Sequence, residues 1–124
     1  MKALHFVVAL FISCATLAQT KQNYQNQLPS NEAIFQINDL DVERYNALFK
    51  AMERDGNFSI LTACIPAHVI HIDWKNKSSN ADSELKKFHQ IAEQCGLFRI
   101  NHMPLWEVSQ FEEECLKARN TNKN

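Results

Sequence analysis

The stretch DVERYNALFKAMERDGNFSILTAC, residues 41–64, carries the pattern that decides the fold. Its first half has apolar residues at helical spacing, and the residues predicted to share one helix face are Val42, Tyr45, Leu48, Phe49 and Met52. Asp41 is a candidate N-cap, and Gly56 stands where a left-handed C-cap would end the helix. The second half alternates as a strand does. The face predicted to turn toward the helices consists of Phe58, Ile60, Thr62 and Cys64.

The same plan recurs further along the chain. A second helical face is predicted from Leu85, Phe88, Ile91, Ala92 and Cys95, and Gly96 ends it. Strands are predicted at 33–37 and 68–74, with a last strand at 97–103 and a hairpin at 64–67 between the middle strands. The order βαββαβ predicts an α+β, ferredoxin-like sandwich over residues 33–103, with both helices on one face of an antiparallel sheet.

Residues 104–124 add a further helix to this sandwich. From Val108, apolar residues recur at offsets that predict a C-terminal helix, and this helix has to cover apolar surface. It could lie on the second face of the sheet or on the flank beside the last strand. The second face is predicted to carry Leu61, Ala63, Val69, His71 and Arg99.

The N-terminus reads as an export signal. Lys2 precedes a short apolar run, and small residues then predict cleavage after Ala18, so that residues 1–18 are a signal peptide. Two alternatives are a buried N-terminal element and a lipoprotein signal ending at Cys14. Residues 19–32 are rich in amides and are predicted to be a flexible polar lead-in. The expected location is therefore secreted or periplasmic.

Composition limits the classes of partner. The whole chain of 124 residues has a formal net charge of −1 and no basic stripe, which argues against nucleic acid. Apart from the signal, the sequence has no apolar run long enough to span a membrane. The expected partner is another exported or envelope protein.

The element order resembles that of the heavy-metal-associated domains, a group of small ferredoxin-like proteins that pass copper or zinc between proteins. The resemblance covers about residues 33–103. The metal site of that family is a Cys-x-x-Cys between the first strand and the first helix. The corresponding loop here is Asn38-Asp39-Leu40-Asp41 and contains no cysteine, so no metal ligand carries over.

Signal cleavage would leave Cys64, Cys95 and Cys115. In an oxidising compartment two of them are expected to pair. Cys95 with Cys115 is the predicted disulfide, because both lie on predicted inward helix faces, and Cys64 is then free. The alternative is a tetrahedral site for zinc or copper(I) formed by Cys64, Cys95, Cys115 and His68.

No catalytic set is predicted. Cys64 could act as a nucleophile only with His68 or His71 as a base, and no third orienting residue is evident, so a packed cysteine is favoured. The leading hypothesis is an exported, non-catalytic binding or accessory module that acts through the second face of the sheet or its edge. The alternative is a heavy-metal-binding or thiol-redox protein.

Overall fold

The computed structural model describes residues 28–122 as an α+β fold with a four-stranded antiparallel sheet and three α-helices. The elements in chain order are β1 (Glu32–Ile37), α2 (Val42–Asp55), β2 (Phe58–Cys64), the 3₁₀ turn η1 (Ile65–Ala67), β3 (Val69–Trp74), α3 (Ala81–Gln94), β4 (Ile100–His102) and α4 (Val108–Asn122). The strand order in the sheet is β2-β3-β1-β4. This order and the βαββαβ connectivity are those of the predicted ferredoxin-like sandwich.

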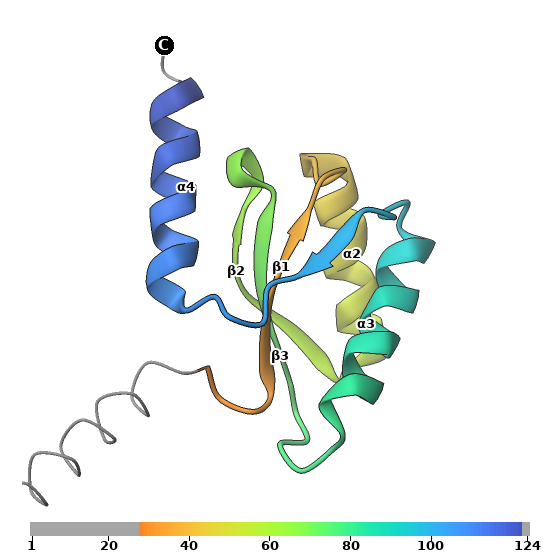
Figure 1. Ribbon diagram of the computed structural model, residues 1–124. Helices are drawn as coiled ribbons and strands as arrows, with labels where there is room; N and C mark the ends of the chain where they lie inside the picture. Colours follow the sequence, from red (N-terminus) through yellow and green to blue (C-terminus); the bar gives the residue numbers. More distant parts are fainter. Residues whose placement is uncertain (1–27, 123–124) are drawn as a thin grey trace, which may run out of the picture.

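The sheet lies between two unequal helical layers. Helices α2 and α3 lie along one face, and α4 lies on the opposite side of the sheet (Figure 1). The predicted C-terminal helix therefore covers the second face of the sheet, the first of the two positions that the sequence allowed.

Local capping sets the ends of α2. The Asp41 side chain accepts a hydrogen bond from the Arg44 N–H at 2.8 Å, and Gly56 ends the helix with a φ of 78°. In α3 the N-cap is Asn80, whose side chain accepts a hydrogen bond from the Asp82 N–H.

The main core lies between the sheet and helices α2 and α3. Its fully buried side chains include Phe35, Leu48, Met52, Trp74 and Phe88. The rings of Phe35 and Phe88 stack with centroids 4.5 Å apart. The helical spacing of α2 is thus confirmed for Leu48 and Met52, whereas Val42 and Phe49 are exposed on its flank. The predicted face was too wide, because a helix packed on a sheet buries only one stripe.

A second, smaller apolar cluster lies between the sheet and α4. Its buried members are Ile34, Cys64, Val69, Phe111 and Cys115. Because Phe111 and Cys115 are one helical turn apart on α4, they face the sheet together. The cluster fixes where α4 sits.

A β-bulge in β2 decides which side chains reach each face. Ile60 pairs with Ile72 and Thr62 with His71, so Leu61 is an extra residue without a partner on β3. One inserted residue reverses the alternation that follows it. Ala63 therefore packs with the α2 and α3 side, and Cys64 turns toward α4. The prediction that Cys64 faces the helices α2 and α3 was wrong for this reason.

The ends of the fold differ from the predicted ranges. β4 covers three residues instead of 97–103, and Phe98, which precedes it, is exposed. Residues 28–31 belong to the folded unit, since Asn31 is buried and its side-chain amide donates to the Trp74 carbonyl oxygen at 2.7 Å.

The predicted signal peptide and Cys14 lie outside the described residues. Between residues 28 and 122, none of the helices has both the length and the apolar character needed to cross a membrane.

Candidate functional site

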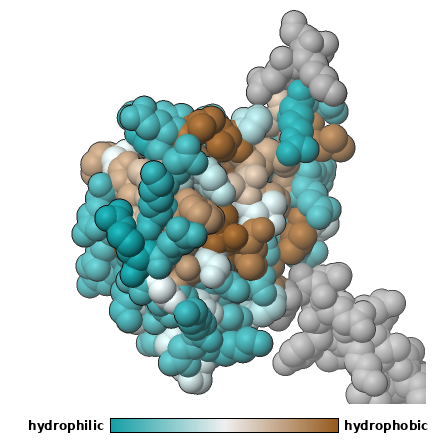
Figure 2. Space-filling model, turned by 180° about the vertical axis from the view of Figure 1, so that it is seen from behind, coloured by the Kyte–Doolittle hydropathy of each residue, from teal (hydrophilic) through white to brown (hydrophobic). Residues whose placement is uncertain are grey.

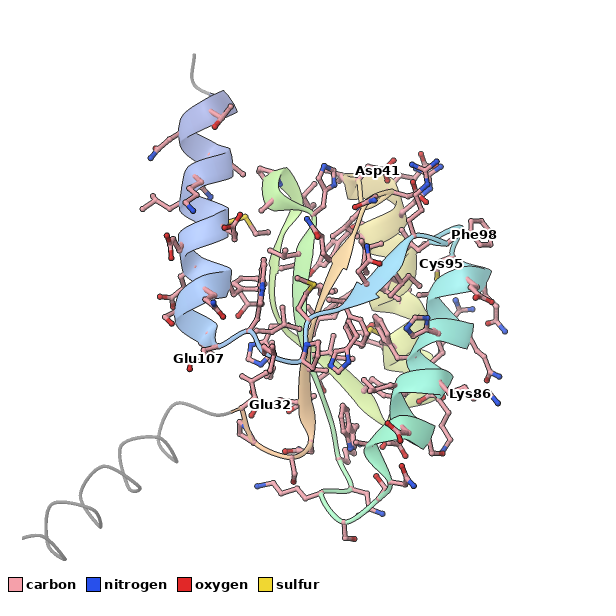
Figure 3. The ribbon with its side chains drawn as sticks, viewed as in Figure 1. Glu32, Asp41, Lys86, Cys95, Phe98 and Glu107 are labelled. Atoms are coloured by element: carbon pink, nitrogen blue, oxygen red, sulfur yellow. A yellow bond between two sulfur atoms is a disulfide. The ribbon has the colours of Figure 1, made fainter. Side chains whose placement is uncertain are left out.

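The candidate site is an open groove at one end of the sheet, which we call the end groove. Its volume is about 470 Å³. It is lined by Leu28, Pro29, Ser30, Glu32, His102, Pro104, Leu105, Trp106 and Glu107. Figure 3 shows Glu32 at the start of β1 and Glu107 at the start of α4, both at this end of the molecule. The groove combines apolar walls with two carboxylates, which is typical of a ligand site.

The register of β1 and β4 explains why the groove opens here. Phe35 pairs with His102, and the Met103 N–H donates to the Ile34 carbonyl oxygen at 2.9 Å. The next hydrogen-bonded pair in this register would be Glu32 with Leu105, but the Glu32 N–H donates to the Pro29 carbonyl oxygen, so the ladder ends at Met103. The chain turns instead, and the Trp106 N–H donates to the Met103 carbonyl oxygen. The segment 104–107 therefore diverges from the entry to β1 and leaves a space between them.

The opposite wall is held by the entry segment. The Glu32 N–H donates to the Pro29 carbonyl oxygen at 3.1 Å, which closes a turn directly before β1. The Trp74 N–H donates to the Asn31 carbonyl oxygen, so this turn is anchored to the end of β3. Leu28 packs against the apolar cluster beneath α4. These contacts make the wall part of the folded domain.

Glu32 links the end groove to a buried histidine. Its Oε1 lies 2.7 Å from Nε2 of His71, and the two side chains are 18% and 8% exposed. The ring of Phe111 from α4 lies over His71 with centroids 6.4 Å apart. The approach is close, but the ring N–H is poorly aligned with the carboxylate for a hydrogen bond. The carboxylate of Glu32 is therefore positioned in the wall of the groove while retaining acceptor capacity.

Glu107 is positioned by the start of α4. Its carbonyl oxygen accepts from the N–H groups of Gln110 and Phe111, and its own N–H donates to Gln110 Oε1 at 3.1 Å. This is half of a capping box, and it holds the backbone of residue 107 in one conformation. The Glu107 carboxylate takes no part in the cap and is available to the groove.

The groove has an acidic lining. Glu32 and Glu107 contribute carboxylates, and none of its lining residues is lysine or arginine. The third titratable group is His102, whose pKa is lowered. The largest cause is burial, and the neighbouring His89 lowers the pKa further. Asp82 raises the pKa by a smaller amount. His102 thus favours its neutral form, and the charge of the lining is negative at neutral pH.

The structure corrects the predicted cysteine pairing. Cys64 and Cys115 form the disulfide, and the thiol of Cys95 is free. The sheet separates Cys95, at the end of α3, from Cys115 on α4 (Figure 1), so the predicted Cys95–Cys115 bond cannot form. Cys64 was predicted to be free, and as a disulfide sulfur it has no thiolate to act as a nucleophile.

The alternative metal site is not assembled either. The residues Cys64, His68, Cys95 and Cys115 do not come together, and no group of three or more metal-ligating side chains suited to an ion occurs within residues 28–122. His68 has a local structural role: its Nδ1 lies 3.1 Å from the Leu40 carbonyl oxygen, and its own carbonyl oxygen accepts from the Ile37 N–H.

The predicted interaction face is not an open surface. Val69 and His71 are buried beneath α4, and Ala63 turns to the other side because of the bulge. Arg99 is exposed but precedes β4, and its carbonyl oxygen accepts from the Asn38 N–H. Of the five residues, Leu61 alone presents an exposed apolar side chain, and it does so at the sheet edge.

Sequence reasoning missed the end groove. Glu32 fell in the predicted lead-in and Glu107 in the predicted tail, and these segments are more than 70 residues apart. The local signals were Pro29 and Pro104, which mark turns, but nothing in the sequence shows that the two turns meet.

Comparisons with protein-family models, with curated proteins and with solved structures found no match to this chain.

Proposed function

We propose that this protein is an exported, non-catalytic binding module, and that its end groove takes a basic side chain with apolar neighbours from another exported or envelope protein. The observation that carries the proposal is the pair of carboxylates, Glu32 and Glu107, in a groove whose lining has no basic residue. The export signal predicted at residues 1–18 and the Cys64–Cys115 disulfide support an oxidising, exported location.

Charge complementarity favours a cationic group. Glu32 is mostly buried, so salt and water screen its charge less than they screen an exposed carboxylate. A guanidinium or ammonium group entering the groove would add charge-assisted hydrogen bonds to the two carboxylates. Trp106 in the same wall offers an aromatic ring to which a cation is attracted. Leu105 and Leu28 supply apolar contact for the stem of the ligand.

The test is an NMR titration of the mature protein with two matched probes. Acetyl-leucyl-arginine amide carries the cation, and acetyl-leucyl-citrulline amide has nearly the same shape without the charge. We expect the arginine probe to shift the amide signals of residues 28–32 and 102–107, and the citrulline probe to bind several-fold more weakly because it forms no ion pair. Added salt is expected to weaken the arginine probe.

Glu107→Gln is the diagnostic variant, because it removes one charge and leaves the backbone cap of α4 intact. Glu112→Gln is the matched control, since Glu112 is exposed on α4 and does not line the groove. Loss of the charge preference in Glu107→Gln alone supports the proposal. Equal binding of both probes, or shifts outside the groove, contradicts it. A hydrolytic or redox activity abolished by one substitution would contradict the non-catalytic part.

A further inference from the structure

The outer edge of β2 is a strand edge without a partner in residues 28–122. In the order β2-β3-β1-β4, β2 pairs with β3 on one side and with no described strand on the other. Edge strands are commonly protected by charged residues or proline. The seven residues of β2, Phe-Ser-Ile-Leu-Thr-Ala-Cys, contain neither.

The bulge is the one protective feature in β2, and it also presents an apolar side chain. Leu61 is the extra residue, and its side chain is 46% exposed at the edge. The segments on either side of it keep regular strand pairing with β3, so their outward N–H and C=O groups remain available for a further strand.

Helix α2 continues the apolar surface beside this edge. Val42 and Phe49 are exposed and lie seven residues apart, and therefore on the same side of the helix. A small groove of about 160 Å³ runs between α2 and β2. Its lining residues are Phe49, Met52, Glu53, Phe58, Ser59 and Ile60. In Figure 1, β4 is at the front of the sheet, so β2, at the opposite edge, is at the back. Figure 2 shows the molecule from behind, so the β2 edge faces the viewer there, and apolar side chains gather across the middle of this view.

We propose that the edge of β2 and the exposed side of α2 bind a second copy of this chain, with the two β2 strands antiparallel about a two-fold axis near Leu61. Such an interface is self-complementary, because the protruding Leu61 side chains of the two copies meet at the two-fold axis. The product is one continuous eight-stranded sheet with the α2 helices side by side.

The charges at this edge fit a second copy better than a charged partner strand. β2 contains no charged residue, so two antiparallel β2 strands would not bring like charges together. Glu53 is the one charged residue that lines the small groove. It lies one helical turn beyond Phe49, toward the end of α2 that leads into β2, and not at Leu61 where the proposed axis passes. A strand rich in lysine or glutamate would find no opposite charges on β2 to pair with.

The two proposals are independent, because the end groove lies beside β1 and β4 and the β2 edge is at the opposite side of the sheet. The second-copy interface is tested by sedimentation velocity and light scattering on the mature protein over a range of concentrations. We expect a concentration-dependent dimer, and Leu61→Lys is expected to raise its dissociation constant by at least about tenfold, because two lysines would meet at the axis.

Phe98→Lys is the matched control, because Phe98 is also apolar and exposed, and it precedes β4, at the edge of the sheet opposite to β2. It should leave the dissociation constant within about twofold of the wild-type value. Phe49→Glu, a second variant on α2, should weaken the dimer as Leu61→Lys does. Circular dichroism checks that each variant is folded. A wild-type chain that stays monomeric to about 1 mM contradicts the proposal, as does a dimer insensitive to Leu61→Lys or equally sensitive to Phe98→Lys.

Discussion

His102 shows how one side chain couples the stability of the fold to pH. Its ring lies 5.3 Å from that of Phe35, and burial, with His89 as the next contributor, lowers its pKa below the ordinary value of 6.5. The unfolded chain therefore binds a proton at this residue more readily than the folded chain does. Below about pH 6.5 this difference destabilises the fold, and the full effect is reached below the lowered pKa of the folded state.

We predict that the free energy of unfolding falls as the pH is lowered from about 8 to about 5, and that His102→Gln reduces this fall. The measurement is urea denaturation of both proteins at several pH values in that range. Because the side chain of His102 is exposed, the difference is small. A steeper fall in His102→Gln than in the wild type would show that the sign is wrong.

Helix α4 is the element whose attachment depends most on one bond. The Cys64–Cys115 disulfide joins it to the end of β2, and beside it only Phe111 is a buried anchor of the helix on the sheet. The two cysteines are 51 residues apart in the sequence. A disulfide that closes a loop of this length lowers the conformational entropy of the unfolded chain, which stabilises the folded state by about 4 kcal/mol. We predict a loss of that order in the Cys64→Ser, Cys115→Ser double variant, measured by denaturant unfolding.

The loss should be accompanied by faster amide hydrogen exchange in α4, while β1 and β3 stay protected. Cys95→Ser is the matched control, because it removes a cysteine that forms no disulfide, and we expect it to cost less than about 1 kcal/mol. If the double variant is as stable as the wild type, packing of Phe111 and its neighbours is sufficient to hold α4.

For the whole molecule, the proposed export leads to a prediction about the covalent state of the mature chain. We predict that the mature protein begins at Gln19 and is lighter than its reduced sequence by the two hydrogens lost to the Cys64–Cys115 disulfide. Under denaturing conditions it should contain one reactive thiol, Cys95. In the folded protein this thiol should react slowly, because burial raises its pKa more than the nearby Arg54 lowers it.

Intact mass and thiol titration of protein taken from its native compartment test this prediction together. An acylated N-terminus at Cys14 would contradict cleavage after Ala18 and identify a lipoprotein. Three reactive thiols would contradict the disulfide, and retention of residues 1–18 would contradict the signal peptide.

The fold could be predicted from the sequence because its determinants are local. The helical spacing of Leu48 and Met52, the cap formed by Asp41 and the left-handed Gly56 are each decided within a few residues. The repeat of this pattern around Phe88 and Ala92 then leaves few ways to arrange two helices and four strands, and the predicted α+β sandwich is one of them.

The sites depended on tertiary structure. The bulge at Leu61 arises from the pairing of β2 with β3, and this single extra residue sends Cys64 to Cys115 instead of toward the α2 and α3 face. Glu32 and Glu107 line one groove only after β1 and β4 pair and the chain turns at residues 104–105. The sequence by itself determined which elements form, because capping and periodicity act over short distances. Only the tertiary structure decided which side chains meet, because strand register acts between residues far apart in the chain.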